Sequence, residues 1–259
     1  DPAKVIVPSI FPDNAIVRSD ILDYYVEVEH FDLMVERAIA SLEKRGHLDN
    51  TIVVVTSDHG MPFPRAKASL YDWGSRVPLA IRWPRGIRNP GRDVKDFVNL
   101  SDLAPTFIEA AGADVPSMMT ASSLMKIFSG QKMNDRDAAY IAMERHDGCR
   151  EGGKGYPCRA VRTQDYLYIY NFEPGRWPSG SPDPRVCARS IPFGEIDTSP
   201  TKSFMMESRM EHGIAHLAEL SFGMRPAEEL YDLKKDPEQL ANVAGLIEYS
   251  TIQHARRRQ

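Results

Sequence analysis

Residues 51–60 constrain the fold of this chain more than any other stretch. The run Ile52–Val55 is apolar and β-branched throughout, and Asp58, His59 and Gly60 follow it closely. A run of this kind, bounded by turn residues, predicts a strand buried on both faces of a sheet. Ligands of open α/β sheets sit just beyond the carboxyl ends of such strands, and both Asp and His can bind a metal. We therefore expect these residues to belong to a metal-assisted ester hydrolase.

The composition is that of an ordinary globular protein. The 259 residues are enough for one large domain or two moderate ones, and they are 42% hydrophobic and 26% charged. A net charge of -4 gives no reason to expect nucleic acid as a partner. No apolar run approaches the roughly 18 residues that span a membrane. The first four residues lack the apolar segment of a signal peptide, but a chain that starts on Asp can be processed or truncated, so no compartment follows.

Three cysteines leave the redox state open. Cys149 and Cys158 lie nine residues apart and could pair in an oxidising compartment, which would leave Cys187 free. Three reduced thiols are an equally good interpretation.

The clearest helix is predicted over residues 20–45. Its apolar positions recur at steps of three and four: Ile21, Tyr25, Val28, Phe31, Val35, Ile39 and Leu42. Ser19 can cap its start, and Gly46 can end it. We expect this stripe to pack on the sheet.

The first half of the chain continues in an α/β pattern. A second short buried strand is predicted at 77–83, another short strand at 97–100, and a helix from Ser101 to Ala111. Helix, strand, strand and helix alternate in this way over residues 18–112. We assign residues 1–125 to this part, followed by a linker with a short helix near 123–128.

The second half of the chain has a different pattern of apolar residues. Its strand-like segments are short and alternate with a period of two: 138–143, 159–163 and 166–172. They predict a small antiparallel sheet in a second domain, residues 137–259. Helical character is expected at 203–220 and after Pro237, with a strand and turn over 229–237.

Several segments resemble, in the same order, the motifs of one enzyme family. They are Leu48 to Gly60, Lys67 with Leu70-Tyr71-Asp72, Arg76 to Leu79, Asp102-Leu-Ala-Pro-Thr106, Arg159 to Thr163, and Glu229 to Leu233 with Asp236-Pro237. Together they resemble the sulfatase family of the alkaline-phosphatase-like superfamily. Gly60 to Pro64 and Tyr156-Pro157 are most similar to its heparan N-sulfatase (sulfamidase) branch. The resemblance implies a partial alkaline-phosphatase-like α/β sandwich with a smaller C-terminal subdomain.

Two motifs of that family do not occur in this sequence. Sulfatases carry an early C/S-x-P-S/T-R segment, whose Cys or Ser becomes the formylglycine nucleophile, and an early Asp-Asp pair on the metal. Cys187-Ala-Arg-Ser190 lacks the Pro and has the Arg in the wrong place. We therefore expect this chain to be the C-terminal portion of a sulfatase, inactive alone, with the missing N-terminal half as its partner.

The resemblance implies roles for three residues. Asp58 would bind a divalent metal, and Lys67 would contact the sulfate as a point charge. His59 replaces the Asn of most sulfatases, so it could bind the metal or hydrogen-bond the substrate oxyanion. We expect calcium, with manganese or zinc as alternatives because imidazole suits them better. His59 also favours the main rival interpretation, a phosphodiesterase or phosphonate hydrolase of the same superfamily.

Arg145 and His146 follow a predicted strand and enter a glycine-rich loop, where substrate contacts are common. They could recognise an acidic sugar, although an ordinary charged loop is an equally good interpretation. The expected substrate is a sulfated, glycosaminoglycan-type sugar, and the resemblance implies a periplasmic, secreted or lysosomal protein. The other alternative is a fragment that only binds sulfated glycans.

Overall fold

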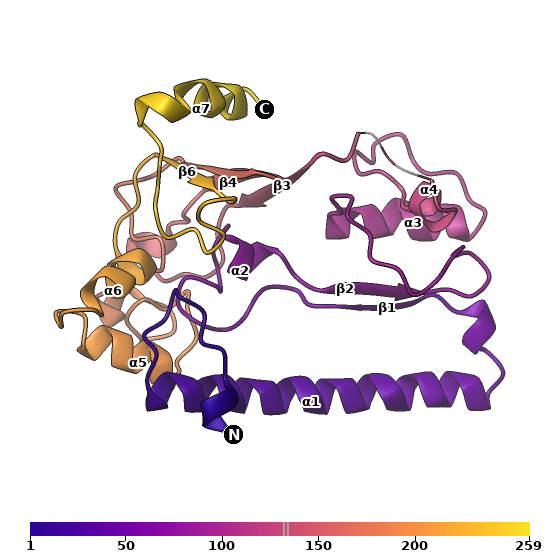
Figure 1. Cartoon of the computed structure of the whole chain (residues 1–259), viewed down its shortest axis with the longest axis horizontal. Coiled ribbons are helices and arrows are strands. Elements are labelled where there is room, and N and C mark those ends of the chain that lie inside the picture. Colours follow the sequence, from indigo (N-terminus) through magenta and orange to yellow (C-terminus); the bar gives the residue numbers. More distant parts are fainter. Residues whose placement is uncertain (132, 134) are drawn as a thin grey trace. The chain divides into compact units, whose positions relative to one another are not determined.

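The computed structural model describes every residue except 132 and 134 (Figure 1). The chain divides into two compact units that are interleaved along the sequence. One unit comprises Asp1–Phe31, Ser57–Val77 and Ile141–Gln259, and the other comprises Asp32–Thr56 and Pro78–Tyr140. The division into domains 1–125 and 137–259 that the sequence indicates stays a prediction.

Helix α1 is a single long helix over Ala15–Lys44 (Figure 1). It begins earlier than predicted because Asn14, and not Ser19, is its cap: the Asn14 side-chain oxygen accepts the backbone N–H groups of Ile16 and Val17. Gly46, in the left-handed region at φ 70°, follows its end as expected.

The apolar stripe of α1 is buried only at its beginning, contrary to the prediction that it packs along a sheet. Ile21 is 2% exposed and lies in a core with Phe63 and Met205. Tyr25 and Phe31 further along are 44% and 50% exposed. The periodicity identified the helix correctly, but periodicity alone does not fix how much of a stripe its neighbours cover.

The second unit contains a two-stranded antiparallel sheet. Strand β1 (Val53–Thr56) pairs with β2 (Leu79–Arg82), with Val53 opposite Arg82 and Thr56 opposite Leu79. Both strands occur where the sequence predicts them. The expected burial on both faces is wrong here: β1 is half-buried throughout, and β2 alternates between half-buried and exposed residues. In the part of the chain that the structure describes, this sheet has no third strand to cover their outer edges.

Two short helices also belong to this unit. A 3-10 turn (Leu100–Asp102) leads into α3 (Leu103–Ala110), and α4 (Met125–Phe128) packs Ile127 and Phe128 into a small core. The strand predicted at 97–100 is absent because Asn99 and Asp102 form a capping box that starts the helical turn there. The predicted helices at 101–111 and near 123–128 are confirmed.

A four-stranded sheet of order β3–β4–β5–β6 confirms the antiparallel prediction for the second half. Its strands are β3 (Ala138–Met143), β4 (Cys158–Thr163), β5 (Tyr166–Asn171) and β6 (Glu228–Asp232). β5 pairs antiparallel with β4 and with β6, and a core of apolar and aromatic side chains, including Leu167, Ile169 and Tyr231, packs against them.

Short helices complete the fold. They are α2 (Asp72–Ser75), α5 (Pro200–Glu207), α6 (Ala215–Phe222), α7 (Ser250–Arg257) and the 3-10 turns Pro2–Lys4, Leu48–Asn50, Glu151–Gly153, Pro184–Val186 and Ile247–Tyr249. The helical segment predicted at 203–220 is therefore two helices. Within the described chain, no helix combines the length and apolarity needed to cross a membrane.

The cysteines pair differently from the suggested arrangement. Cys149 forms a disulfide with Cys187, and Cys158 is the free thiol. Cys158 lies in β4 with its side chain in the core of the sheet, whereas Cys149 and Cys187 lie on two loops that meet. Burial raises the pKa of the Cys158 thiol to about 11, so this thiol stays protonated near neutral pH.

Candidate functional site

The Asp58–His59 pair presents two ligand atoms side by side. The Asp58 side chain is 87% exposed, and its Oδ2 lies 3.7 Å from His59 Nε2. His59 Nδ1 lies 2.7 Å from the carbonyl oxygen of Gly60. Because a carbonyl can only accept, Nδ1 must carry the proton, and neutral His59 presents an unprotonated Nε2. A backbone partner on Nδ1 is the usual support of a metal-binding histidine.

Gly60 is required beside this pair because another backbone segment lies very close to it. A Cβ at this position would lie 1.8 Å from the carbonyl oxygen of Trp73. The two backbone segments also bond directly, because the Gly60 N–H donates to Gly74 O over 3.0 Å. The glycine therefore permits close backbone contact that holds the Asp58–His59 loop in place.

The donor set of Asp58 and His59 fits part of a divalent metal site. Metal–ligand bonds of about 2.0–2.6 Å allow two atoms 3.7 Å apart to share one ion. The described residues contain no group of three or more His, Cys, Asp or Glu side chains placed to hold a metal. The two side chains would therefore need further ligands from elsewhere.

Lys67 is held by a carboxylate. Its side chain is 13% exposed, and its Nζ forms an ion pair with Asp197 Oδ2. Arg189 Nη2 lies 3.0 Å from the other oxygen, Asp197 Oδ1. Burial raises the pKa of Asp197, but the hydrogen bonds from Lys67 and Arg189 outweigh it and leave that pKa below its usual value. Lys67 is thus a fixed, largely shielded cation.

The backbone around Lys67 adopts an uncommon conformation. Arg65 and Ala68 have φ values of 58° and 53°, in the left-handed region that non-glycine residues seldom occupy. The Arg65 guanidinium donates to Leu220 O over 2.8 Å and lies 3.9 Å above the centre of the Tyr71 ring. These buried contacts keep the segment that carries Lys67 in this conformation.

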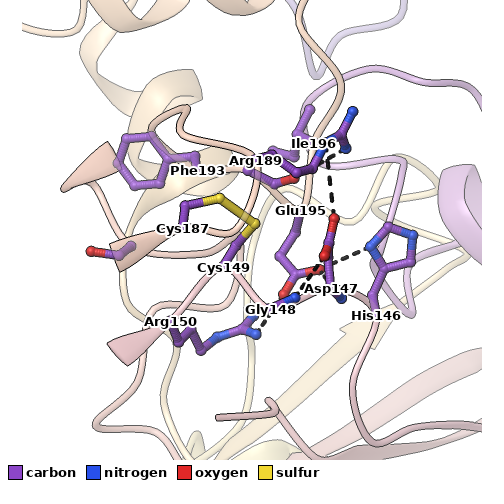
Figure 2. Close-up of a disulfide and its surroundings, with 12 residues drawn as sticks. His146, Asp147, Gly148, Cys149, Arg150, Cys187, Arg189, Phe193, Glu195 and Ile196 are labelled. Carbon is purple, nitrogen blue, oxygen red and sulfur yellow. Dashed lines mark hydrogen bonds and ion pairs between the residues drawn. A yellow bond between two sulfur atoms is a disulfide. The ribbon is translucent and has the colours of Figure 1, made fainter. Parts of the chain in front are cut away.

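The loop after β3 is organised by one buried carboxylate, Glu195, which is 1% exposed (Figure 2). His146 Nδ1 lies 2.9 Å from Glu195 Oε2, and the backbone N–H of Asp147 donates to the same oxygen over 2.8 Å. Arg150 Nη1 lies 2.5 Å from Glu195 Oε1. Arg145, by contrast, is exposed and forms no hydrogen bond with any described residue.

The Cys149–Cys187 disulfide lies beside this carboxylate and ties the two loops together (Figure 2). Gly194 allows the close approach, since a Cβ there would lie 2.3 Å from Cys187 Sγ and 2.5 Å from Cys149 Sγ. Arg189 adds a weaker link, with its Nε 3.9 Å from Asp147 Oδ2.

The structure therefore brings the predicted site residues together in two groups. Asp58 and His59 form one. Lys67 and His146 belong to a second, which Asp197, Arg189 and Glu195 connect by way of Asp147. Within the described residues, no hydrogen bond or ion pair joins the first group to the second. Sequence reasoning missed the three connecting residues because nothing in the local pattern around 187–197 distinguishes a buried carboxylate from a solvated one.

Comparison with known proteins identifies related sequences along nearly the whole chain. Residues 8–113 match the sulfatase family model, and residues 62–177 match the model of the N-sulphoglucosamine sulphohydrolase C-terminal region. An ulvan-active sulfatase of Formosa agariphila is 28% identical over 95% of this chain and 38% of its own length. Human N-sulphoglucosamine sulphohydrolase is 25% identical over 94% of this chain and 47% of its own.

A solved structure of a related protein also aligns with nearly the whole chain. It is described as a complex with its substrate D-glucosamine-2-N,6-O-disulfate, and it aligns with a TM-score of 0.64 and 26% identity over 93% of this chain and 39% of its own. The fold is therefore alkaline-phosphatase-like, and the chain spans less than half the length of the relatives it matches. Two family models that overlap along residues 8–177, and relatives that span nearly all of the chain, show that this chain is similar to sulfatases along most of its length.

Proposed function

We propose that this chain forms the C-terminal part of a sulfatase that hydrolyses sulfate esters or sulfamates of glycosaminoglycan-type sugars. The observation that supports this most is the placement of Asp58, His59 and Lys67 inside the region that matches the sulfatase family. The sulfated glucosamine in the related solved structure supports the substrate class. The sugar-binding residues of this proposal are Arg145 and His146, together with Lys67.

The chemistry explains why these residue types are needed. Cleavage of a sulfate ester places negative charge on the leaving oxygen and on the sulfuryl oxygens. Sulfatases generally use a divalent metal, which stabilises such charge when bound. Asp58 would hold that ion through its exposed carboxylate and His59 through the unprotonated Nε2. Asp197 already holds the Lys67 side chain in place. Its charge would therefore face the sulfate with no need to order the side chain during the reaction.

Calcium is the metal we propose, with manganese and zinc as alternatives. Oxygen ligands such as Asp58 suit calcium, whereas the imidazole of His59 suits the other two ions. The family's covalent nucleophile, a formylglycine, would come from residues outside these 259. Metal analysis of the purified full-length protein, before and after dialysis against a chelator, tests the choice of ion.

A reaction on phosphate or phosphonate esters is the second candidate, because His59 replaces the usual Asn of sulfatases. Turnover of matched aryl sulfate and aryl phosphate esters by the full-length protein decides between the two. We expect sulfate release to be the faster reaction, and faster phosphate release would overturn the proposal. A third alternative is that the 259-residue chain by itself only binds sulfated glycans.

The disulfide supports a location outside the reducing cytosol, since such bonds persist in oxidising compartments. We therefore propose a periplasmic, secreted or lysosomal protein whose partners are its sulfated sugar and the N-terminal half of the same protein.

A further inference from the structure

The two nitrogens of His146 have very different surroundings. Nδ1 lies 2.9 Å from Glu195 Oε2, inside the cluster, while the side chain as a whole is 34% exposed. Nε2 has no hydrogen-bond partner among the residues that the structure describes. Figure 2 places the imidazole at the edge of the cluster, with Nδ1 on the dashed line to Glu195. Nδ1 therefore contacts the protein, and Nε2 is available to a ligand.

Glu195 has the surroundings of an ionised carboxylate. Its Oε1 accepts from the Arg150 guanidinium over 2.5 Å, and its Oε2 accepts from the Asp147 backbone N–H over 2.8 Å. Both oxygens thus already face donors that cannot act as acceptors. An ionised carboxylate has no proton to give, so His146 Nδ1 must be the donor in the contact between them.

The proton on Nδ1 determines what Nε2 can do. When one nitrogen of a neutral imidazole is protonated, the other is an acceptor. His146 would then suit a hydroxyl or an N–H of a sugar rather than a sulfate oxygen, which is itself an acceptor. Anion binding is left to the cations Arg145 and Lys67.

We propose that Glu195 is a positioning residue that fixes the proton of His146 on Nδ1, so that Nε2 accepts a hydrogen bond from a hydroxyl or N–H group of the substrate sugar. The second half of this statement rests on the proposed function. The first half concerns this chain alone and does not depend on turnover.

The surrounding framework makes the arrangement rigid. Arg150 also donates to Trp177 O and Pro178 O over 2.6 Å and 2.7 Å, so the guanidinium that faces Glu195 cannot turn away easily. Gly194, the residue before Glu195, lies against the Cys149–Cys187 disulfide. The charged and titratable groups that face this imidazole and its loop are Glu195, Arg150, Asp147 and, through Asp147, Arg189.

The first test measures the tautomer directly. Long-range proton–nitrogen correlation spectra of the full-length protein, labelled with 15N-histidine, distinguish protonated from unprotonated ring nitrogens. At roughly pH 8, where an unperturbed imidazole is neutral, we expect protonated Nδ1 and unprotonated Nε2 for His146. The chain has seven histidines, and H146N identifies the signal by removing it. A protonated Nε2 on neutral His146 in the unaltered protein would overturn the proposal.

The variant E195Q tests whether Glu195 is what holds the proton of His146 on Nδ1. With its oxygen retained by Arg150, the new amide group would donate to Nδ1, and the tautomer should move toward protonated Nε2. E144Q is the matched control, because Glu144 is a neighbouring exposed carboxylate, paired with Arg159, and 65% of its side chain is exposed. An unchanged tautomer in folded E195Q would contradict the role of Glu195. If E195Q does not fold, the tautomer of His146 in the unaltered protein still tests the proposal.

The final test concerns the sugar. Saturation with D-glucosamine-2-N,6-O-disulfate should move the Nε2 resonance of His146 in the direction of a hydrogen-bond acceptor that gains a donor. In turnover of the same compound, E195Q should raise KM about tenfold, with a smaller change in kcat, and E144Q should change neither. No movement of Nε2 on saturation would overturn the acceptor role. A protein that shows the expected tautomer but releases no sulfate would contradict the proposed function and leave the role of Glu195 standing.

Discussion

The two groups of candidate residues are built in opposite ways. The Asp58–His59 pair stands on an exposed loop, close behind a strand, and backbone contacts at Gly60 hold it. The group around Glu195 has a buried centre, Glu195 and Arg150, and it is joined by ion pairs and tied by a disulfide. The ligand atoms of the first group are exposed and contribute little to the stability of the fold. In the second group, a charge network with a buried centre fixes side chains that reach the surface. Changes in the second group should therefore affect stability, and changes in the first should affect chemistry.

The largest expected effect is on stability, from the change E195A. Glu195 and Arg150 are 1% and 6% exposed in their side chains, so the change leaves a buried guanidinium without its carboxylate. Loss of one partner of a buried ion pair costs roughly 3–5 kcal/mol of unfolding free energy. Urea unfolding of the full-length protein measures it. The control E144A removes an exposed pair and should cost no more than about 1 kcal/mol, and equal losses in both variants would contradict the comparison.

Removal of the disulfide should have the next largest effect. Cys149 and Cys187 are 38 residues apart, and closing a loop of that length stabilises the fold by about 4 kcal/mol in the chain-entropy model. The double change C149S with C187S should lower the urea midpoint, and a reductant should lower that of the unaltered protein similarly. The reductant should then have no effect on the double variant. A midpoint that resists reduction in the unaltered protein would rule out this bond as a determinant of stability.

The change D58N should affect the reaction and leave the fold unaltered. We expect at least about a hundredfold loss of sulfate release by the full-length enzyme, near 2.7 kcal/mol of barrier, as for the loss of one electrostatic stabiliser. The melting temperature should stay close to that of the unaltered protein, because the side chain is 87% exposed. D49N, at an exposed aspartate without a proposed role, is the matched control. Full turnover in D58N would remove this residue from the site.

Sequence reasoning named both residues of the first group but missed the residues that connect the second. Asp58 and His59 follow a β-branched run, and that position in an α/β chain is where ligands bind. Glu195 and Asp197 lie in a segment without periodicity, and their roles depend on contacts with residues 45 and 130 positions away, Arg150 and Lys67. Long-range pairing of this kind leaves no local pattern. The disulfide was missed for the same reason, since spacing along the chain favoured Cys158.

The fold shows the same division between local and non-local information. Most strand and helix positions followed from periodicity, with the strand predicted at 97–100 as an exception, and the antiparallel pairing of β4, β5 and β6 followed from the short alternating segments. The degree of burial did not follow. The apolar stripe of α1 and both faces of β1 were expected to be covered, and both are partly exposed in the described chain. Burial depends on which surfaces meet, and hydrophobic spacing only states which face is apolar.

The smallest expected effect is the pH dependence that Asp197 contributes. Its pKa is lowered in the folded protein, so its stabilising contribution is present above the unfolded value of about 4 and is lost as pH falls through the folded pKa. Unfolding free energies at roughly pH 6 and pH 3 should therefore differ less in D197N than in the unaltered protein, while D49N should behave like the unaltered protein. Equal acid sensitivity in D197N would mean that Lys67 and Arg189 gain nothing from their shared carboxylate. Because Asp197 holds Lys67, the same variant should weaken sulfate release more at saturating substrate than D49N does, which would connect the buried network to the chemistry of the exposed pair.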